Sequence, residues 1–153
     1  IAAMPLPPMR SNVERVGRAL LINDAYNSNP GSARAAIELL AQAGGPAARR
    51  QRVAVLGTML ELGPSTAQLH DDIARAALAA GGDVIAGVGE FGAALTRVNA
   101  PAERAISAPD PAALWPLLVS RLQPDAVILL KGSRGVRLEK LVPHITDWAQ
   151  RST

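Results

Sequence analysis

The sequence predicts an α/β domain of Rossmann-like type, in which a mostly parallel sheet carries helices on both faces. Short apolar runs alternate with segments whose apolar residues recur at helical spacing, which is the pattern of successive β-α units. The runs are continuously apolar rather than alternating, as expected of strands that are buried on both faces. With 153 residues, of which 48% are hydrophobic, the chain is long enough to build one such core.

The apolar runs give the order of the expected strands. Five of them are expected to be core strands, at residues 19–22, 53–56, 84–86, 104–106 and 126–130. Residues 11–16 and 18–24 flank Gly17 and are expected to form a short hairpin. Before them, Pro5, Pro7 and Pro8 indicate a linker over residues 1–10. The domain is therefore expected to span residues 11–153.

The ends of the expected helices are marked by side chains with known capping behaviour. Four residues are expected to cap first turns: Asn29, Ser65, Asp110 and Ser133. Asn29 and Asp110 each precede a proline, which favours the first helical position, and Ser65 has a glutamine three residues later. Glycine pairs at residues 44–45 and 81–82 are expected to end helices. Pro143 is expected to kink or shorten the last helix.

The composition excludes several classes of protein. The formal net charge is only +3, the 16 Lys and Arg residues are scattered and aromatic residues are 3%, so a nucleic-acid surface is not expected. The apolar stretches are far shorter than the ~20 residues that cross a bilayer. Without cysteine, the chain can form no disulfide and no thiolate metal site. We expect a cytoplasmic protein without a membrane span and without a metal site in this domain.

Two loops are candidates for ligand binding, because open α/β sheets bind ligands outside the carboxyl ends of their strands. The loop after the first core strand carries Asp24, Tyr26, Asn27 and Asn29, whose donors and acceptors suit ribose hydroxyls or an amide. The alternative is that this loop only caps a helix. The loop after the last strand carries Lys131 and Arg134 beside an expected helix start, which favours an anion, with two solvated cations as the alternative.

A glycine pattern follows the third core strand. Gly87, Gly89 and Gly92 match G-x-G-x-x-G, the dinucleotide fingerprint, but they lie in the third β-α unit and lack the acidic ribose partner. The pattern leaves two alternatives, a cofactor site and a tight turn. Neither lysine is followed by Ser or Thr, so the chain has no P-loop.

Three segments resemble motifs of one enzyme family. Residues 24–32, DAYNSNPGS, followed by Ala35-Ala36, are similar to a segment of the UDP-N-acetylmuramoyl-tripeptide–D-alanyl-D-alanine ligases, the MurF branch of the Mur ligases. Residues 55–63, VLGTMLELG, with His70 after them, resemble a second motif, although Thr58 stands where Asp is usual. Residues 130–135, LKGSRG, resemble the V-K-G-S-R motif. The resemblance extends from residue 10 to about residue 145.

The resemblance implies the C-terminal domain of an ATP-dependent ligase. In this family ATP and magnesium activate the carboxylate of UDP-MurNAc-tripeptide as an acyl phosphate, which the amine of D-Ala-D-Ala then attacks. The N-terminal domain holds the UDP-sugar, and the central domain holds the P-loop and the magnesium ligands. The matching positions imply nucleotide contacts from five residues and dipeptide contacts from three: Arg10, Asp24, Tyr26, Asn27 and Asn29, then Lys131, Ser133 and Arg134.

Other functions remain open at this point. They are a different Mur-type amino-acid ligase, a stand-alone dinucleotide-binding module that uses Gly87 to Gly92, and a small-ligand binding domain without catalysis. On the leading interpretation residues 1–10 link this domain to a central ATPase domain, and the isolated chain neither hydrolyses ATP nor ligates D-Ala-D-Ala.

Overall fold

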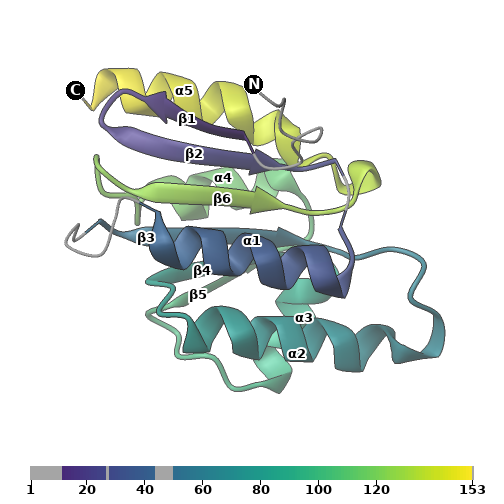
Figure 1. The fold of residues 1–153 in the computed structure, drawn as a ribbon. Coiled ribbons are helices and arrows are strands. Elements are labelled where there is room, and N and C mark those ends of the chain that lie inside the picture. Colours follow the sequence, from purple (N-terminus) through teal and green to yellow (C-terminus); the bar gives the residue numbers. More distant parts are fainter. Residues whose placement is uncertain (1–11, 27, 44–49, 153) are drawn as a thin grey trace, which may run out of the picture.

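The strands form one sheet with the order β1-β2-β6-β3-β4-β5, seen in a computed structural model that describes residues 12–26, 28–43 and 50–152 (Figure 1). The strands are β1 (Asn12–Val16), β2 (Ala19–Asp24), β3 (Arg52–Gly57), β4 (Val84–Val88), β5 (Ala105–Ala108) and β6 (Val127–Lys131). Only the β1–β2 pair is antiparallel among these described strands. The predicted hairpin is confirmed, with Gly17 at φ 59° between its strands. The Rossmann-like prediction is confirmed.

Helices cover both faces of the sheet. One face packs against α1 (Pro30–Gln42), α2 (Thr66–Ala79) and α3 (Glu90–Arg97), and the other packs against α4 (Pro111–Val119) and α5 (Leu141–Arg151). In β6, Ile128 and Leu130 join the α4–α5 side of the core, whereas Val127 and Leu129 join the α1–α3 side. Successive side chains of a strand point to opposite faces, so a continuously apolar run matches a strand covered on both sides.

Two of the predicted helix caps are confirmed. The Asn29 Oδ1 accepts the Ser32 N–H at 2.8 Å, and the Ser32 Oγ accepts the Asn29 N–H at 3.1 Å, which completes a capping box. The Asp110 Oδ1 accepts the Ala113 N–H at 2.8 Å. Both caps are local hydrogen bonds across three residues, which is why the sequence alone located them.

The other two predicted caps are wrong. Ser65 lies at the end of a 3₁₀ turn, η1 (Gly63–Ser65), and its side chain makes no capping bond among the described residues; Thr66 instead donates its hydroxyl to the Gly63 carbonyl at 2.7 Å. Ser133 precedes a 3₁₀ turn, η2 (Arg134–Val136), and accepts the Leu60 N–H from a neighbouring loop at 3.1 Å. At Ser65 the neighbouring threonine makes the local bond instead, and at Ser133 a tertiary partner takes the hydroxyl.

The remaining predicted helix ends have mixed outcomes. Gly81 follows α2 at φ 87°, as predicted, while residues 44–45 and the linker at residues 1–10 lie outside the described part of the chain. A third 3₁₀ turn, η3 (Leu138–Lys140), precedes α5. Pro143 therefore falls in the first turn of α5, where a missing N–H removes no helical hydrogen bond, and the α-helix is shortened rather than kinked.

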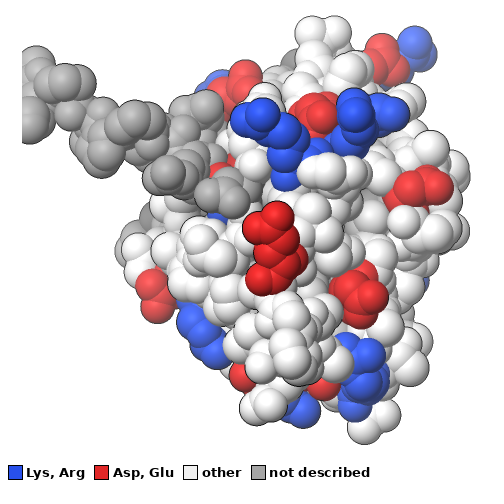
Figure 2. Space-filling view, turned by 90° about the vertical axis from the view of Figure 1, so that its right-hand side faces the viewer, with Lys and Arg blue, Asp and Glu red and all other residues white. Residues whose placement is uncertain are grey.

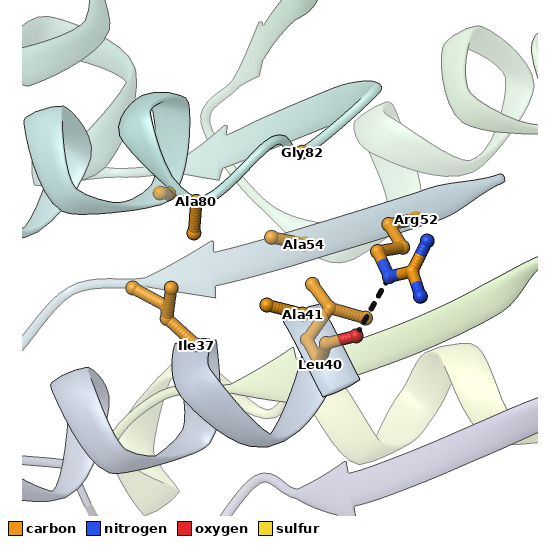
Figure 3. Close-up of a pocket in the computed structure, with 8 residues that line it drawn as sticks. Ile37, Leu40, Ala41, Arg52, Ala54, Ala80 and Gly82 are labelled. Atoms are coloured by element: carbon orange, nitrogen blue, oxygen red, sulfur yellow. Dashed lines mark hydrogen bonds between the residues drawn. The ribbon is translucent and has the colours of Figure 1, made fainter. Parts of the chain in front are cut away.

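Arginines hold the amino-end edge of the sheet. Arg52 donates from Nε to the Leu40 carbonyl and from a terminal guanidinium nitrogen to the Ala43 carbonyl, both at 3.1 Å, at the last turn of α1 (Figure 3). Arg104 donates to the Leu78 and Gly82 carbonyls at 2.7–3.0 Å at the end of α2. Cations are favoured at helix carboxyl ends. These two arginines therefore stabilise the fold.

Candidate ligand site at the carboxyl ends of the strands

The strand order has a topological switch point at β6, which lies between β2 and β3. The loops after β2 and β3 lead to α1 and α2 on one face, whereas the loop after β6 leads to α5 on the other. Such a switch point leaves a crevice at the carboxyl ends of the strands. The two predicted ligand loops, which begin after Asp24 and Lys131, therefore meet there.

A cleft of about 440 Å³ lies between these loops, lined by Tyr26, Arg134, Gly135, Arg137 and Glu139. Figure 2 looks onto the carboxyl ends of the parallel strands, and Lys and Arg side chains gather beside acidic ones in the upper part of the view. Tyr26 is 52% exposed, and Arg134 is also exposed. The structure thus brings one residue from each predicted loop into one cleft.

Asp24 and Lys131 form a buried ion pair beside this cleft. They are register partners on β2 and β6, and the Lys131 Nζ donates to the Asp24 Oδ2 at 2.8 Å. The Lys131 and Asp24 side chains are only 1% and 4% exposed. Buried charges are costly unless they are paired, so the two residues depend on each other. The sequence analysis predicted a nucleotide contact for Asp24 and a dipeptide contact for Lys131. The structure places the two side chains in contact with each other.

The loop after β3 is tied to both of its neighbours. The Ser133 Oγ accepts the Leu60 N–H, which joins this loop to the loop after β6. Thr58 donates its hydroxyl to the Val88 carbonyl at 3.4 Å and accepts the Glu90 N–H at 3.0 Å, which joins it to β4 and the start of α3. Thr58 thus has a structural role as a neutral hydroxyl, both donating and accepting.

His70 holds the loop after β3 through a hydrogen bond from α2. It is fully buried on α2, and its Nε2 accepts the Met59 N–H at 2.9 Å. Its Nδ1 lies 2.7 Å from the Thr66 carbonyl and must carry the proton to donate there. The ring also meets Phe91 edge-on, with centroids 4.6 Å apart. Sequence reasoning left this histidine without a role; its place shortly after the second motif was the available signal.

The other predicted site residues vary in their placement. Asn29 is exposed, but its side-chain oxygen serves the α1 cap. Ser133 is buried and is not among the residues that line the cleft. Arg10 and Asn27 lie outside the described residues. Arg137 and Glu139 line the cleft although sequence reasoning missed them, because they follow the last motif at positions that no pattern singled out.

The glycine pattern after β4 serves packing. A Cβ on Gly87 would lie 2.6 Å from the backbone carbon of Phe91, so only glycine fits there. Gly89 has φ 69° at the start of α3, a conformation that suits glycine. The Glu90 N–H, which could donate to a phosphate, already donates to the Thr58 hydroxyl. These observations match the tight turn rather than the cofactor site.

The described residues hold no group of three or more His, Asp or Glu side chains that could bind a metal ion. None of their helices has the length and apolar character needed to cross a membrane.

Comparison with known proteins identifies the family. The family model described as "Mur ligase, glutamate ligase domain" matches residues 9–134. This chain belongs to the Mur ligase family. The Mur ligase domain is 35% identical over 128 residues to the UDP-N-acetylmuramoyl-tripeptide–D-alanyl-D-alanine ligase of Escherichia coli, a match that covers 84% of this chain.

Solved structures agree with this assignment. The Mur ligase domain matches MurF from Acinetobacter baumannii with a TM-score of 0.80 and 30% identity over 94% of this chain. It also matches MurF from Thermotoga maritima, solved in complex with ADP, with a TM-score of 0.78 and 22% identity over 99% of this chain, which shows the shared fold. The chain spans 27% of the E. coli enzyme and 31% of the A. baumannii one. It therefore corresponds to under a third of these ligases.

Proposed function

We propose that this Mur ligase domain is the C-terminal part of a ligase that adds D-Ala-D-Ala to UDP-MurNAc-tripeptide at the expense of ATP. The proposal is supported by identities near 35% to ligases of that name and by a cleft that joins two of the motif loops. The rest of the ligase would supply the UDP-sugar site, the P-loop and the magnesium ligands. Such a ligase would work in the cytoplasm, where ATP is available.

The loop after β2 is the proposed nucleotide side of the cleft. Asp24 ends the strand and Tyr26 presents an exposed aromatic ring beside it. Arg10, Asn27 and Asn29 complete the proposed nucleotide contacts. Magnesium is proposed to bind outside this domain, since a magnesium site needs oxygen ligands and usually the substrate phosphates.

The loop after β6 is the proposed dipeptide side. Arg134 is exposed at the cleft, and a guanidinium can donate two parallel hydrogen bonds to a carboxylate. Lys131 and Ser133 belong to the same proposed group, and both are tied to neighbouring strands and loops. The amine of the bound dipeptide would attack the acyl phosphate and displace phosphate.

The observation that carries the proposal is the exposed Arg134 in a cleft shared with the loop after β2. A charge-assisted hydrogen bond of this kind contributes about 1.5–3 kcal/mol. In the full-length ligase, Arg134→Ala should therefore raise the KM for D-Ala-D-Ala by about 10- to 150-fold, with a much smaller change for ATP. Steady-state kinetics with each substrate varied in turn measures this.

Arg75→Ala is the matched control, because Arg75 is an exposed arginine on α2. It should leave both Michaelis constants unchanged. If Arg134→Ala weakened ATP while the dipeptide constant stayed within about twofold, the two loops would have been assigned to the wrong ligands.

A further inference from the structure

The cleft between the loops after β2 and β6 carries charges of both signs. Arg134 and Arg137 are exposed, Glu139 is half-buried, and all three line the cleft with Tyr26. Among the described residues, none of these three charged side chains takes part in a salt bridge. Their charges are thus available to a molecule that enters the cleft.

The carboxylate of Glu139 points most strongly to a ligand. Its Oε1 is buried and has no hydrogen-bond partner among the described residues. A buried carboxylate oxygen without a donor is costly, because it has lost its water without gaining a hydrogen bond. A donor brought by a ligand would remove that cost.

We infer that Glu139 receives the amino end of the incoming dipeptide, while Arg134 and Arg137 receive its carboxylate end. This rests on the proposed function and deepens it, because it assigns the two ends of D-Ala-D-Ala to separate side chains. An extended dipeptide spans at most about 7 Å, so both of its ends fit within one cleft of this size. The exposed ring of Tyr26 offers an apolar surface to the small methyl side chains.

This arrangement selects a molecule with an amine at one end and an anion at the other. Each end makes charge-assisted hydrogen bonds, which are stronger than those between neutral groups. A dipeptide whose carboxylate is converted to an amide keeps its contact with Glu139 and loses those with the two arginines. The two halves of the site can therefore be tested separately.

The test compares variants of the full-length ligase on D-Ala-D-Ala and on its C-terminal amide. Glu139→Gln keeps the shape and removes the charge, so it should raise the KM for D-Ala-D-Ala at least 10-fold and leave that for ATP within twofold. Its preference for D-Ala-D-Ala over the amide should not change. Arg134→Gln and Arg137→Gln should each lower that preference in kcat/KM by at least fivefold.

Glu103→Gln is the matched control, an exposed carboxylate in the turn before β5. It should behave like the wild-type ligase. Thermal melting of each variant checks its folding. Glu139→Asp retracts the carboxylate by one methylene. It is assayed in the same way and should raise the KM for D-Ala-D-Ala by at least threefold. Dipeptide constants within twofold of wild type in both Glu139 variants would overturn the inference. A wild-type ligase that does not accept D-Ala-D-Ala would overturn the proposed function itself, and the inference with it.

Discussion

Lys131 and Asp24 lie at the carboxyl ends of neighbouring strands and neutralise each other inside the protein. Lys131 is thus a fully buried lysine, while Arg134 and Arg137, which line the cleft, are exposed. The same division applies to Ser133 and Arg134, where the first bonds a neighbouring loop and the second faces the cleft. Residues that are adjacent in one motif therefore do different work.

Removing the lysine should destabilise the protein. Lys131→Met leaves the Asp24 carboxylate buried without its ion-pair partner, a change that costs about 3–5 kcal/mol in comparable cases. Urea unfolding should show that loss as a lower midpoint. The double variant Lys131→Met/Asp24→Asn removes both charges and should recover most of the stability. Equal losses in the single and the double variant would contradict the importance of the pair.

At the scale of elements, short turns after the strands are packed so closely that particular backbone positions tolerate no side chain. Gly87 at the end of β4 touches the first turn of α3, and the turn after β3 is held by His70 from α2. The loop after β3 is therefore supported by α2, and through Leu60 and Ser133 it contacts the loop after β6 that lines the cleft. This support is what keeps a loop-built site in one geometry.

Two glycine-to-alanine substitutions should have opposite effects on stability, one through overpacking and the other through the conformational freedom of the unfolded chain. Gly87→Ala places a Cβ 2.6 Å from the Phe91 backbone, which must shift, and overpacking of this kind costs about 1–3 kcal/mol. Gly31→Ala lies within α1, where the nearest atom to its Cβ is the Asn29 Oδ1 at 3.4 Å, and it should stabilise by about 0.4–1 kcal/mol. Chemical unfolding of both variants measures the opposite signs. A neutral Gly87→Ala would show that the α3 turn yields more easily than the packing indicates.

At the scale of the whole molecule, the sheet, its two helical layers and the cleft lie within the described residues, while the described residues hold no metal-binding group. A nucleotide that reacts needs its phosphates cradled and its charge neutralised by metal ions. The chain contains no P-loop sequence. Under the proposed function, the domain contributes walls and charges to the active site, and the P-loop and the magnesium ligands belong to the rest of the ligase.

The isolated chain should unfold cooperatively on heating and should not turn over ATP. Both core layers are filled by helices of the described residues, so we expect the chain to fold without another domain. Circular dichroism follows the unfolding, and phosphate release in the presence of magnesium follows the turnover. Phosphate release above that of a reaction without the protein would contradict the assignment of this chain as one domain of a larger ligase.

The sequence by itself determined the class of fold, the hairpin and two helix caps. Short, continuously apolar runs that alternate with helical patterns are typical of strands covered on both faces, and the Asn29 and Asp110 caps are bonds across three residues. It also located the two loops that line the cleft, because each begins where an apolar run ends. Ser65 shows the limit of this reasoning, since a capping pattern yields to a 3₁₀ turn when the preceding backbone is not extended.

Only the tertiary structure decided which side chains meet. Placing β6 between β2 and β3 brings Lys131 to Asp24, which is 107 residues away, and brings Ser133 to the loop after β3. The same placement opens a cleft in which Arg137 and Glu139 join Tyr26 and Arg134. Local periodicity records how one segment is buried but not which strand lies beside it. The strand order is therefore what shows which charged side chains of this site lie together.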